Sequence, residues 1–171
     1  MLAVARRLEV VSRACGYAAA LLLLALIALM VYEVVVRYAL AAPTIWGYDV
    51  TTMVMGASFV FAISYALATD SHVRIDLLHA RFGPRVRPVV DLVGYGLVLL
   101  PIVAWLAWGM FGHFHHALAS GETSGLSAWN PKVWPFRLAL VVGVLAWLVQ
   151  IVAEILRAIV AVRGGEAAPR G

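Results

Sequence analysis

Charged side chains are scarce in this sequence. Of its 171 residues, 13% are Asp, Glu, Lys or Arg and 64% are hydrophobic, and the mean hydropathy is +0.94. A typical soluble domain is about 25% charged and roughly half apolar. Because a water-soluble fold cannot hide this much apolar surface, the composition predicts an all-α integral membrane protein.

Cysteine is almost absent as well. Cys15 is the single cysteine, which excludes a disulfide within the chain and any site built from several thiolates. The sequence also lacks the GxGxxG, P-loop, GxSxG and HExxH motifs of common enzyme classes. We therefore predict no enzymatic activity, no bound cofactor and no catalytic or metal-binding residues.

The apolar residues form four long runs. We predict membrane-spanning helices at about residues 14–38, 48–69, 89–118 and 134–162. Each run reaches the roughly 20 residues that a helix needs to cross a bilayer. The first run is longer than the 7 to 15 apolar residues of a cleaved signal peptide, so we expect it to be retained. The prediction is one four-helix membrane domain over residues 1–163 and a disordered tail over 164–171.

Positive charges are distributed unevenly between the connections. The N-terminal segment, the connection of the second and third spans and the C-terminal end hold Arg6, Arg7, Arg13, Arg74, Arg81, Arg85, Arg87, Arg157, Arg163 and Arg170. The loop over residues 39–47 has no Lys or Arg, and the last loop has only Lys132. The positive-inside rule predicts that both termini are cytoplasmic. The net charge of +4 therefore indicates helix ends at a membrane surface and no nucleic-acid partner.

A few charged residues lie near the outer ends of the first two spans. Glu33 and Arg37 are four positions apart on one helical face, and Asp49 at the start of the second span could join Arg37. An ion or proton pathway is one interpretation of such residues. We favour a salt-bridge clasp that holds the first helical hairpin, because these residues lie near the membrane boundary.

Histidines gather near the outer end of the third span. His113 and His116 could share a helical face and bind a metal with Glu122, but we favour a polar cluster at the membrane interface. A haem-carrying anchor of a respiratory complex is an alternative function, although the first, second and fourth spans contain no histidine. A free-standing channel or ion carrier is a third possibility.

Other patterns concern packing. Ser58, Ala62 and Ala66 recur every four positions and permit close helix approach, either within the chain or to another subunit. Pro101 is expected to bend the third span.

The connection between the second and third spans has a pattern of its own. Residues 71–87 are predicted to form a short amphipathic cytoplasmic helix that contacts lipid and protein, with a strand over residues 73–77 as the alternative.

Several of these residues together resemble a known family. Arg37 and Tyr38 end the first span, Trp46 precedes Asp49, His72, Arg74 and Asp76 are spaced His-x-Arg-x-Asp after the second span, and Trp134 and Pro135 open the fourth. This pattern covers most of the chain and resembles the DctQ-type small permease subunit of tripartite ATP-independent periplasmic (TRAP) transporters. The family pattern usually carries Glu where this chain has Asp49, which keeps the charge on a shorter side chain.

The resemblance implies a function and partners. It implies a scaffold subunit in a bacterial inner membrane, where a periplasmic solute-binding protein captures an organic acid and a large permease subunit transports it with a sodium gradient. It also implies that the subunit contacts membrane lipid. The candidate structural or interface residues are Glu33, Arg37, Trp46, Asp49, His72, Arg74, Asp76, Trp134 and Pro135.

Overall fold

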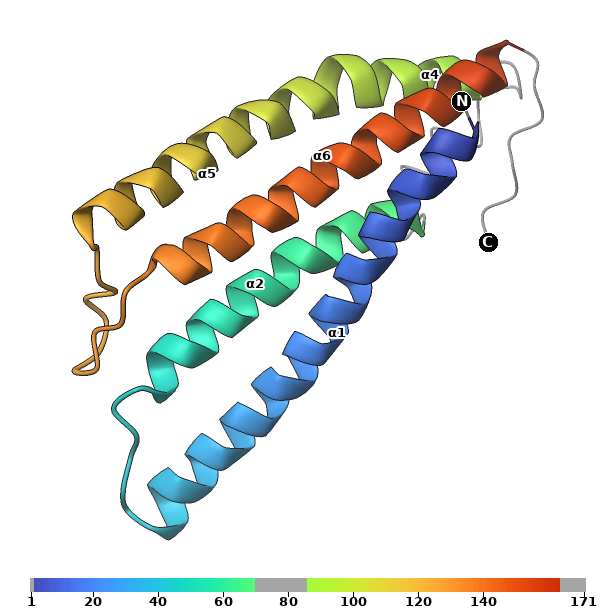
Figure 1. The fold of residues 1–171 in the computed structure, drawn as a ribbon. Helices are drawn as coiled ribbons and strands as arrows, with labels where there is room; N and C mark the ends of the chain where they lie inside the picture. Colours follow the sequence, from blue (N-terminus) through green and yellow to red (C-terminus); the bar gives the residue numbers. More distant parts are fainter. Residues whose placement is uncertain (1, 70–85, 164–171) are drawn as a thin grey trace.

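Long helices account for almost all of the computed structural model, which describes residues 2–69 and 86–163 (Figure 1). The elements are α1 (Leu2–Ala39), α2 (Gly47–Ala68), α4 (Arg87–Val93), the π-helix η1 (Gly94–Leu99), α5 (Leu100–Ser120) and α6 (Trp134–Val162). Within these two ranges the only extended pairing is an isolated bridge between Thr123 and Lys132. The predicted all-α class is confirmed for the described residues.

Four helical stretches are long and apolar enough to cross a membrane. They are Arg7–Ala39, Gly47–Ala68, Pro88–Ser120 and Trp134–Val162. The prediction of four long apolar helices is therefore confirmed. Which side of the membrane each end faces stays a prediction, and the predicted amphipathic helix lies outside the described residues.

The first helix begins well before the predicted span. It starts at Leu2, whereas the apolar run begins near residue 14. Its 38 residues correspond to a length of roughly 57 Å at 1.5 Å per residue, well beyond a hydrocarbon layer of about 30 Å. Hydropathy missed the first turns because they carry charged residues, yet Glu9 and Ser12 are buried against other helices.

The third span contains a widened turn next to its proline. The π-helix η1 joins α4 to α5 and ends two residues before Pro101. A proline ring clashes with the carbonyl four residues earlier, here Leu97, and provides no N–H for that carbonyl. A π turn has a longer hydrogen-bond spacing and relieves this conflict. The helix changes direction in this region, as expected for Pro101 (Figure 1).

The central helix of the bundle is α6. It packs against α1, α2 and the whole third span, whereas α5 has no extensive contact with α1 or α2 in the described part of the chain (Figure 1). The core contains Leu67 from α2, Val103 from α5, and Val144 and Ile151 from α6. The outer surface of α5 is correspondingly open, and Trp105 and Trp108 are about four-fifths exposed, at 79% and 80%.

Glycines set the close approach of α2 and α6. A Cβ atom at Gly143 would lie 2.5 Å from Cγ1 of Val60, and one at Gly56 would lie 2.9 Å from Cζ of Phe136. Neither glycine belongs to the predicted small-residue stripe. Ser58, which belongs to that stripe, is buried within the chain. Of the two alternatives for the stripe, its burial agrees with packing within the chain.

Candidate functional site

Glu33 connects the end of α1 to the start of α2. One of its carboxylate oxygens accepts a hydrogen bond from the Arg37 guanidinium at 2.8 Å, and the other accepts one from the Thr44 hydroxyl. The backbone N–H of Gly47 donates to the same Thr44 oxygen at 3.1 Å. Glu33 is mostly buried, whereas the Arg37 side chain is half exposed. The two Thr44 contacts join the end of α1 to the start of α2, whereas the Arg37 contact lies within α1.

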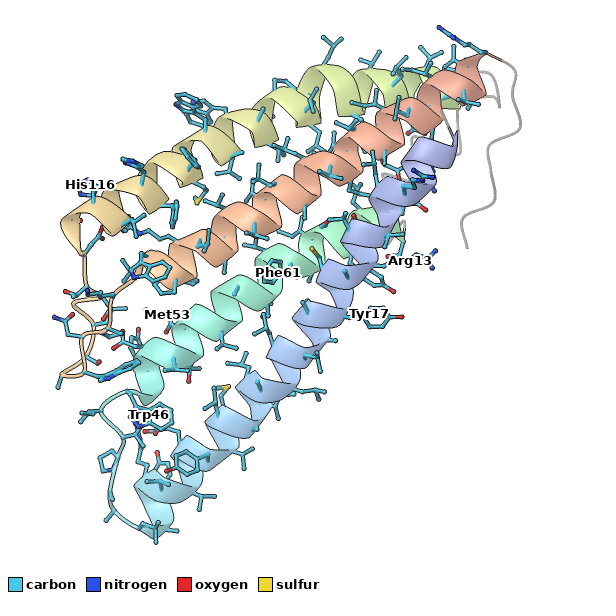
Figure 2. All side chains as sticks on the ribbon, viewed as in Figure 1. Arg13, Tyr17, Trp46, Met53, Phe61 and His116 are labelled. Carbon is cyan, nitrogen blue, oxygen red and sulfur yellow. The ribbon has the colours of Figure 1, made fainter. Side chains whose placement is uncertain are left out.

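Trp46 strengthens the same junction. Its ring stacks on that of Tyr32 with 6.0 Å between the centroids and an interplanar angle of 18°. Trp46 lies immediately before the first residue of α2, and Figure 2 shows it beside the end of α1. An offset stacked pair of this kind contributes about 0.5 to 1.5 kcal/mol beyond the area it buries. Trp46 is therefore a packing residue of the hairpin.

The expected contact between Asp49 and Arg37 is absent. Asp49 is fully buried, and one of its oxygens accepts a hydrogen bond from the hydroxyl of Ser127, which lies 78 residues away. Arg37 is instead paired with Glu33. The prediction was wrong because the loop that carries Ser127 folds over the start of α2, a long-range contact that sequence spacing does not reveal.

The loop between α5 and α6 has its own defined structure. Ser124 N–H donates to the Pro131 carbonyl at 2.9 Å, and Val133 N–H donates to the Glu122 carbonyl at 3.0 Å. The side chain of Glu122 pairs with Arg137 at 2.5 Å, and Arg137 also donates to the backbone carbonyl of His113 at 2.9 Å. The loop is therefore tied to both helices that it connects.

A second polar cluster lies inside the bundle at the opposite end. The Ser64 hydroxyl donates to Ser12 Oγ at 3.0 Å, and the Ser12 hydroxyl donates to Gln150 Oε1 at 2.7 Å. Gln150 Nε2 in turn donates to Glu154 at 2.9 Å. All four side chains are buried. The chain of hydrogen bonds links α2, α1 and α6.

Two ion pairs extend this buried network. The guanidinium of Arg157 lies 3.2 Å from Glu154 and also pairs with Glu9 of α1. All three side chains are at least 89% buried, since the most exposed of them, Arg157, has an exposed fraction of 11%. Buried charges need partners, and here one guanidinium serves two carboxylates.

Sequence reasoning missed this network. Glu9 and Ser12 lie before the predicted first span at about residues 14–38, and nothing in the positions of Ser64 and Gln150 along the chain predicts that they meet. The available signal was the spacing of Gln150, Glu154 and Arg157, which places them on one face of α6. Ser12 lies three residues after Glu9 on the matching face of α1.

Comparison with family models identifies the chain. The model for "Tripartite ATP-independent periplasmic transporters, DctQ component" matches residues 26–161. The chain belongs to the DctQ family. Comparison with curated proteins found no match, and neither did comparison with solved structures. A DctQ component is the small subunit of a TRAP transporter and works with a large permease and a binding protein.

The DctQ match covers the Glu33 contacts, the contact of Asp49 with Ser127 and most of the buried network. It includes Glu33, Asp49 and Arg157, whereas Glu9 and Ser12 precede it. DctQ is a transporter component and not an enzyme family. The resemblance seen in the sequence is thus confirmed at the level of the family.

Two further candidate interface residues of this DctQ protein lie at the start of α6. Trp134 and Pro135 are its first two residues, Trp134 is half-buried, and Pro135 is exposed. Proline is favoured here because the first helical N–H groups have no partner within the helix. The remaining predicted residues, His72, Arg74 and Asp76, lie outside the described residues.

The histidines near the end of α5 do not assemble a site with Glu122. His113, His115 and His116 are exposed, and Glu122 is paired with Arg137. Figure 2 shows His116 near the end of α5. In residues 2–69 and 86–163, no group of three or more His, Cys, Asp or Glu side chains is placed to hold a metal. The alternative metal site therefore has no support there.

Proposed function

We propose that this DctQ protein is a scaffold beside the large permease subunit of its transporter. In this role it widens the stationary part of the complex in the bilayer, so that movement of the transporting domain is not lost as tilting of the whole assembly. Substrates would be organic acids delivered by a periplasmic binding protein, and an ion gradient, sodium in our proposal, would drive uptake.

The use of the polar groups carries this proposal. Glu33, Glu122 and Glu154 each form an ion pair inside the chain. Ser12, Ser64 and Gln150 hydrogen-bond to one another within the bundle. A substrate pathway needs polar groups that face an accessible cavity. These groups are instead paired with one another within the chain, which favours a structural role over transport by this chain alone.

The exposed helix faces support the same role. The third span has the lowest buried fraction of the four, and apart from the histidines near its end its exposed side chains are mostly apolar. In a bilayer such a surface contacts lipid tails or another membrane subunit. We propose a multi-pass location in a bacterial inner membrane, with both termini in the cytoplasm. The uneven distribution of arginines supports this orientation.

The two ends of the bundle have separate proposed roles. Glu33, Arg37 and Asp49 organise the periplasmic end, where the loops between helices would lie near the binding protein. Arg74 and Asp76 are proposed to act at the cytoplasmic junction with the large subunit. The Glu33 contacts and the Asp49 contact with Ser127 support the first of these assignments.

Reconstitution tests the scaffold role. The small and large subunits are co-expressed, purified in mild detergent, identified by mass spectrometry and placed in liposomes with the binding protein. We expect stable co-purification, substrate uptake by the pair and no uptake by this chain alone. Full-rate uptake by the large subunit alone would overturn the scaffold proposal, and flux through this chain alone would favour a carrier.

A further inference from the structure

A small cavity lies between the start of α2, the loop over residues 121–133 and the start of α6. Its volume is about 170 Å³. Its polar lining consists of Asp49, Thr52, Glu122, Thr123, Ser124 and Arg137. Met53 of α2, labelled in Figure 2, contributes to the apolar part of the wall. The cavity is large enough for a water molecule or a small ion.

Asp49 is the unusual member of this lining. The residue is 0% exposed, and its Oδ2 atom accepts the hydrogen bond from Ser127. Its other oxygen, Oδ1, is also buried and has no hydrogen-bond partner among the described residues. Burial of a carboxylate oxygen without a partner is costly, because the oxygen loses its hydrogen bonds to water and gains none from the protein.

The other charged groups of the cavity do not neutralise Asp49. Glu122 and Arg137 pair with each other at 2.5 Å, and Arg137 is further oriented by the His113 carbonyl. One negative charge is therefore left on the lining. Because it is a single charge, a monovalent cation balances it, whereas a divalent ion would leave an excess positive charge.

The uncharged lining supplies suitable further ligands. The Thr52 hydroxyl donates to the Tyr48 carbonyl at 2.9 Å, which leaves the lone pairs of its oxygen free for another contact. Thr123 and Ser124 add two more hydroxyl groups. Carboxylate and hydroxyl oxygens are hard ligands, which suit small cations without soft character.

We propose that this cavity binds one small monovalent cation, of the size of Na⁺ or K⁺, with Asp49 as its anionic ligand. The bound cation stabilises the contact between the start of α2 and the loop over residues 121–133. This site is independent of the proposed scaffold role, since it concerns the stability of the isolated chain and requires neither the large subunit nor a substrate.

Thermal unfolding of the full-length chain in detergent tests the site. The midpoint is measured in NaCl, KCl and choline chloride at equal ionic strength. At a salt concentration of ten times Kd, a bound cation raises the midpoint by about 3 to 5 °C over choline. The Asp49→Asn variant should lose this difference, and Asp91→Asn, the same replacement in α4, should keep it. Ser127→Ala should also keep it, because that change removes a hydrogen bond and leaves the carboxylate.

A direct binding measurement keeps the test decisive if Asp49→Asn does not fold. Equilibrium binding of ²²Na⁺ to the wild-type chain should reach one ion per chain and be competed by unlabelled NaCl but not by choline chloride. A higher midpoint in both NaCl and KCl supports the site as stated. Equal midpoints in all three salts together with no ²²Na⁺ binding would overturn it and leave a cavity filled by water. A sodium effect that survives in Asp49→Asn would also overturn it.

Discussion

The Arg157 side chain pairs with two buried acidic side chains inside this bundle. Its guanidinium contacts Glu154 one turn away on α6 and Glu9 on α1. Each carboxylate is nearly inaccessible to solvent. Charged groups taken out of water are stable only when paired with good geometry. Arg157 therefore makes it possible for both acids to be buried where α1 meets α6.

Replacing Arg157 by Met should strongly destabilise the protein. Met fills much of the same volume but leaves Glu9 and Glu154 without the guanidinium. Loss of one partner of a buried ion pair typically costs about 3 to 5 kcal/mol. Reversible unfolding of the purified chain in mixed detergent would measure the change. Arg163→Met is the matched control, because Arg163 is exposed at the end of α6, and its effect should stay within about 0.5 kcal/mol.

A triple variant distinguishes charge from packing. Adding Glu9→Gln and Glu154→Gln to Arg157→Met removes the two carboxylate charges that have lost the guanidinium and should recover part of the lost stability. If the triple variant were no more stable than Arg157→Met, the loss would come from packing and the electrostatic account of the cluster would be wrong.

At the other end of the bundle, Glu33 should matter more than Arg37. Glu33 accepts bonds from Arg37 and from Thr44, so Glu33→Ala removes the link to the loop as well as the ion pair. Arg37→Ala removes only the contact with Glu33. We expect the larger decrease in thermal midpoint for Glu33→Ala, measured in detergent under identical conditions. A larger decrease for Arg37→Ala would contradict the described role of Glu33.

At the scale of helices, the local sequence explains the bend in the third span, whereas the packing of the bundle explains the close approach of α2 to α6. Pro101 and the preceding π-helix account for the change of direction in the third span, because the proline ring conflicts with the Leu97 carbonyl. The approach of α2 to α6 depends on Gly143, where a side chain would meet Val60. A glycine is therefore needed where another element approaches closely, as at Gly143, and is not needed at an open position such as Gly109.

Gly143→Ala should destabilise the α2 and α6 interface. Its Cβ would lie 2.5 Å from Val60 Cγ1, so the helices or side chains must shift, at a cost of about 1 to 3 kcal/mol. Gly109→Ala in α5 is the control, since no atom lies within 4 Å of its Cβ and alanine is the better helix former. Unfolding measurements should show loss of stability for Gly143→Ala alone.

A double variant tests whether the contact with Val60 is responsible. Adding Val60→Ala removes the clashing Cγ1 atom and should restore part of the stability, with a coupling energy of about 0.5 to 3 kcal/mol. Strictly additive effects of the two substitutions would show that Gly143 is needed for another reason.

At the scale of the whole molecule, the contact of Glu9 with Arg157 places the start of α1 and the end of α6 at the same end of the bundle (Figure 1). The loop between α5 and α6 contacts the start of α2 at the other end through Ser127 and Asp49. With four helices crossing the membrane, the two ends of the bundle face opposite sides. The arginine distribution then predicts which side is cytoplasmic.

Cysteine labelling checks this orientation. In a Cys15→Ser background, Ala128→Cys and Arg163→Cys place single exposed thiols in the loop between α5 and α6 and at the end of α6. A membrane-impermeant maleimide should label Ala128→Cys in intact spheroplasts and Arg163→Cys only after the membrane is permeabilised. The cysteine-free parent should remain unlabelled. The reverse pattern would show that the termini are outside.

The sequence alone determined the class of the fold and the family. Hydropathy is a local property, so four long apolar runs predicted four helices, and the pattern around Arg37, Trp46 and Trp134 indicated the DctQ family. The pair formed by Glu33 and Arg37 was also predictable because both residues lie on one turn of one helix. His72, Arg74 and Asp76 lie outside the described residues, so their predicted roles stay predictions.

Only the tertiary structure decided the partners of the long-range polar residues. Asp49 bonds to Ser127 instead of Arg37, and Glu9 is buried against Arg157 at the far end of the chain. A side chain's burial depends on which helices meet it, and that depends on the packing of all four together. Hydropathy and spacing report on single helices, and they therefore missed both the buried network and the cavity beside Asp49.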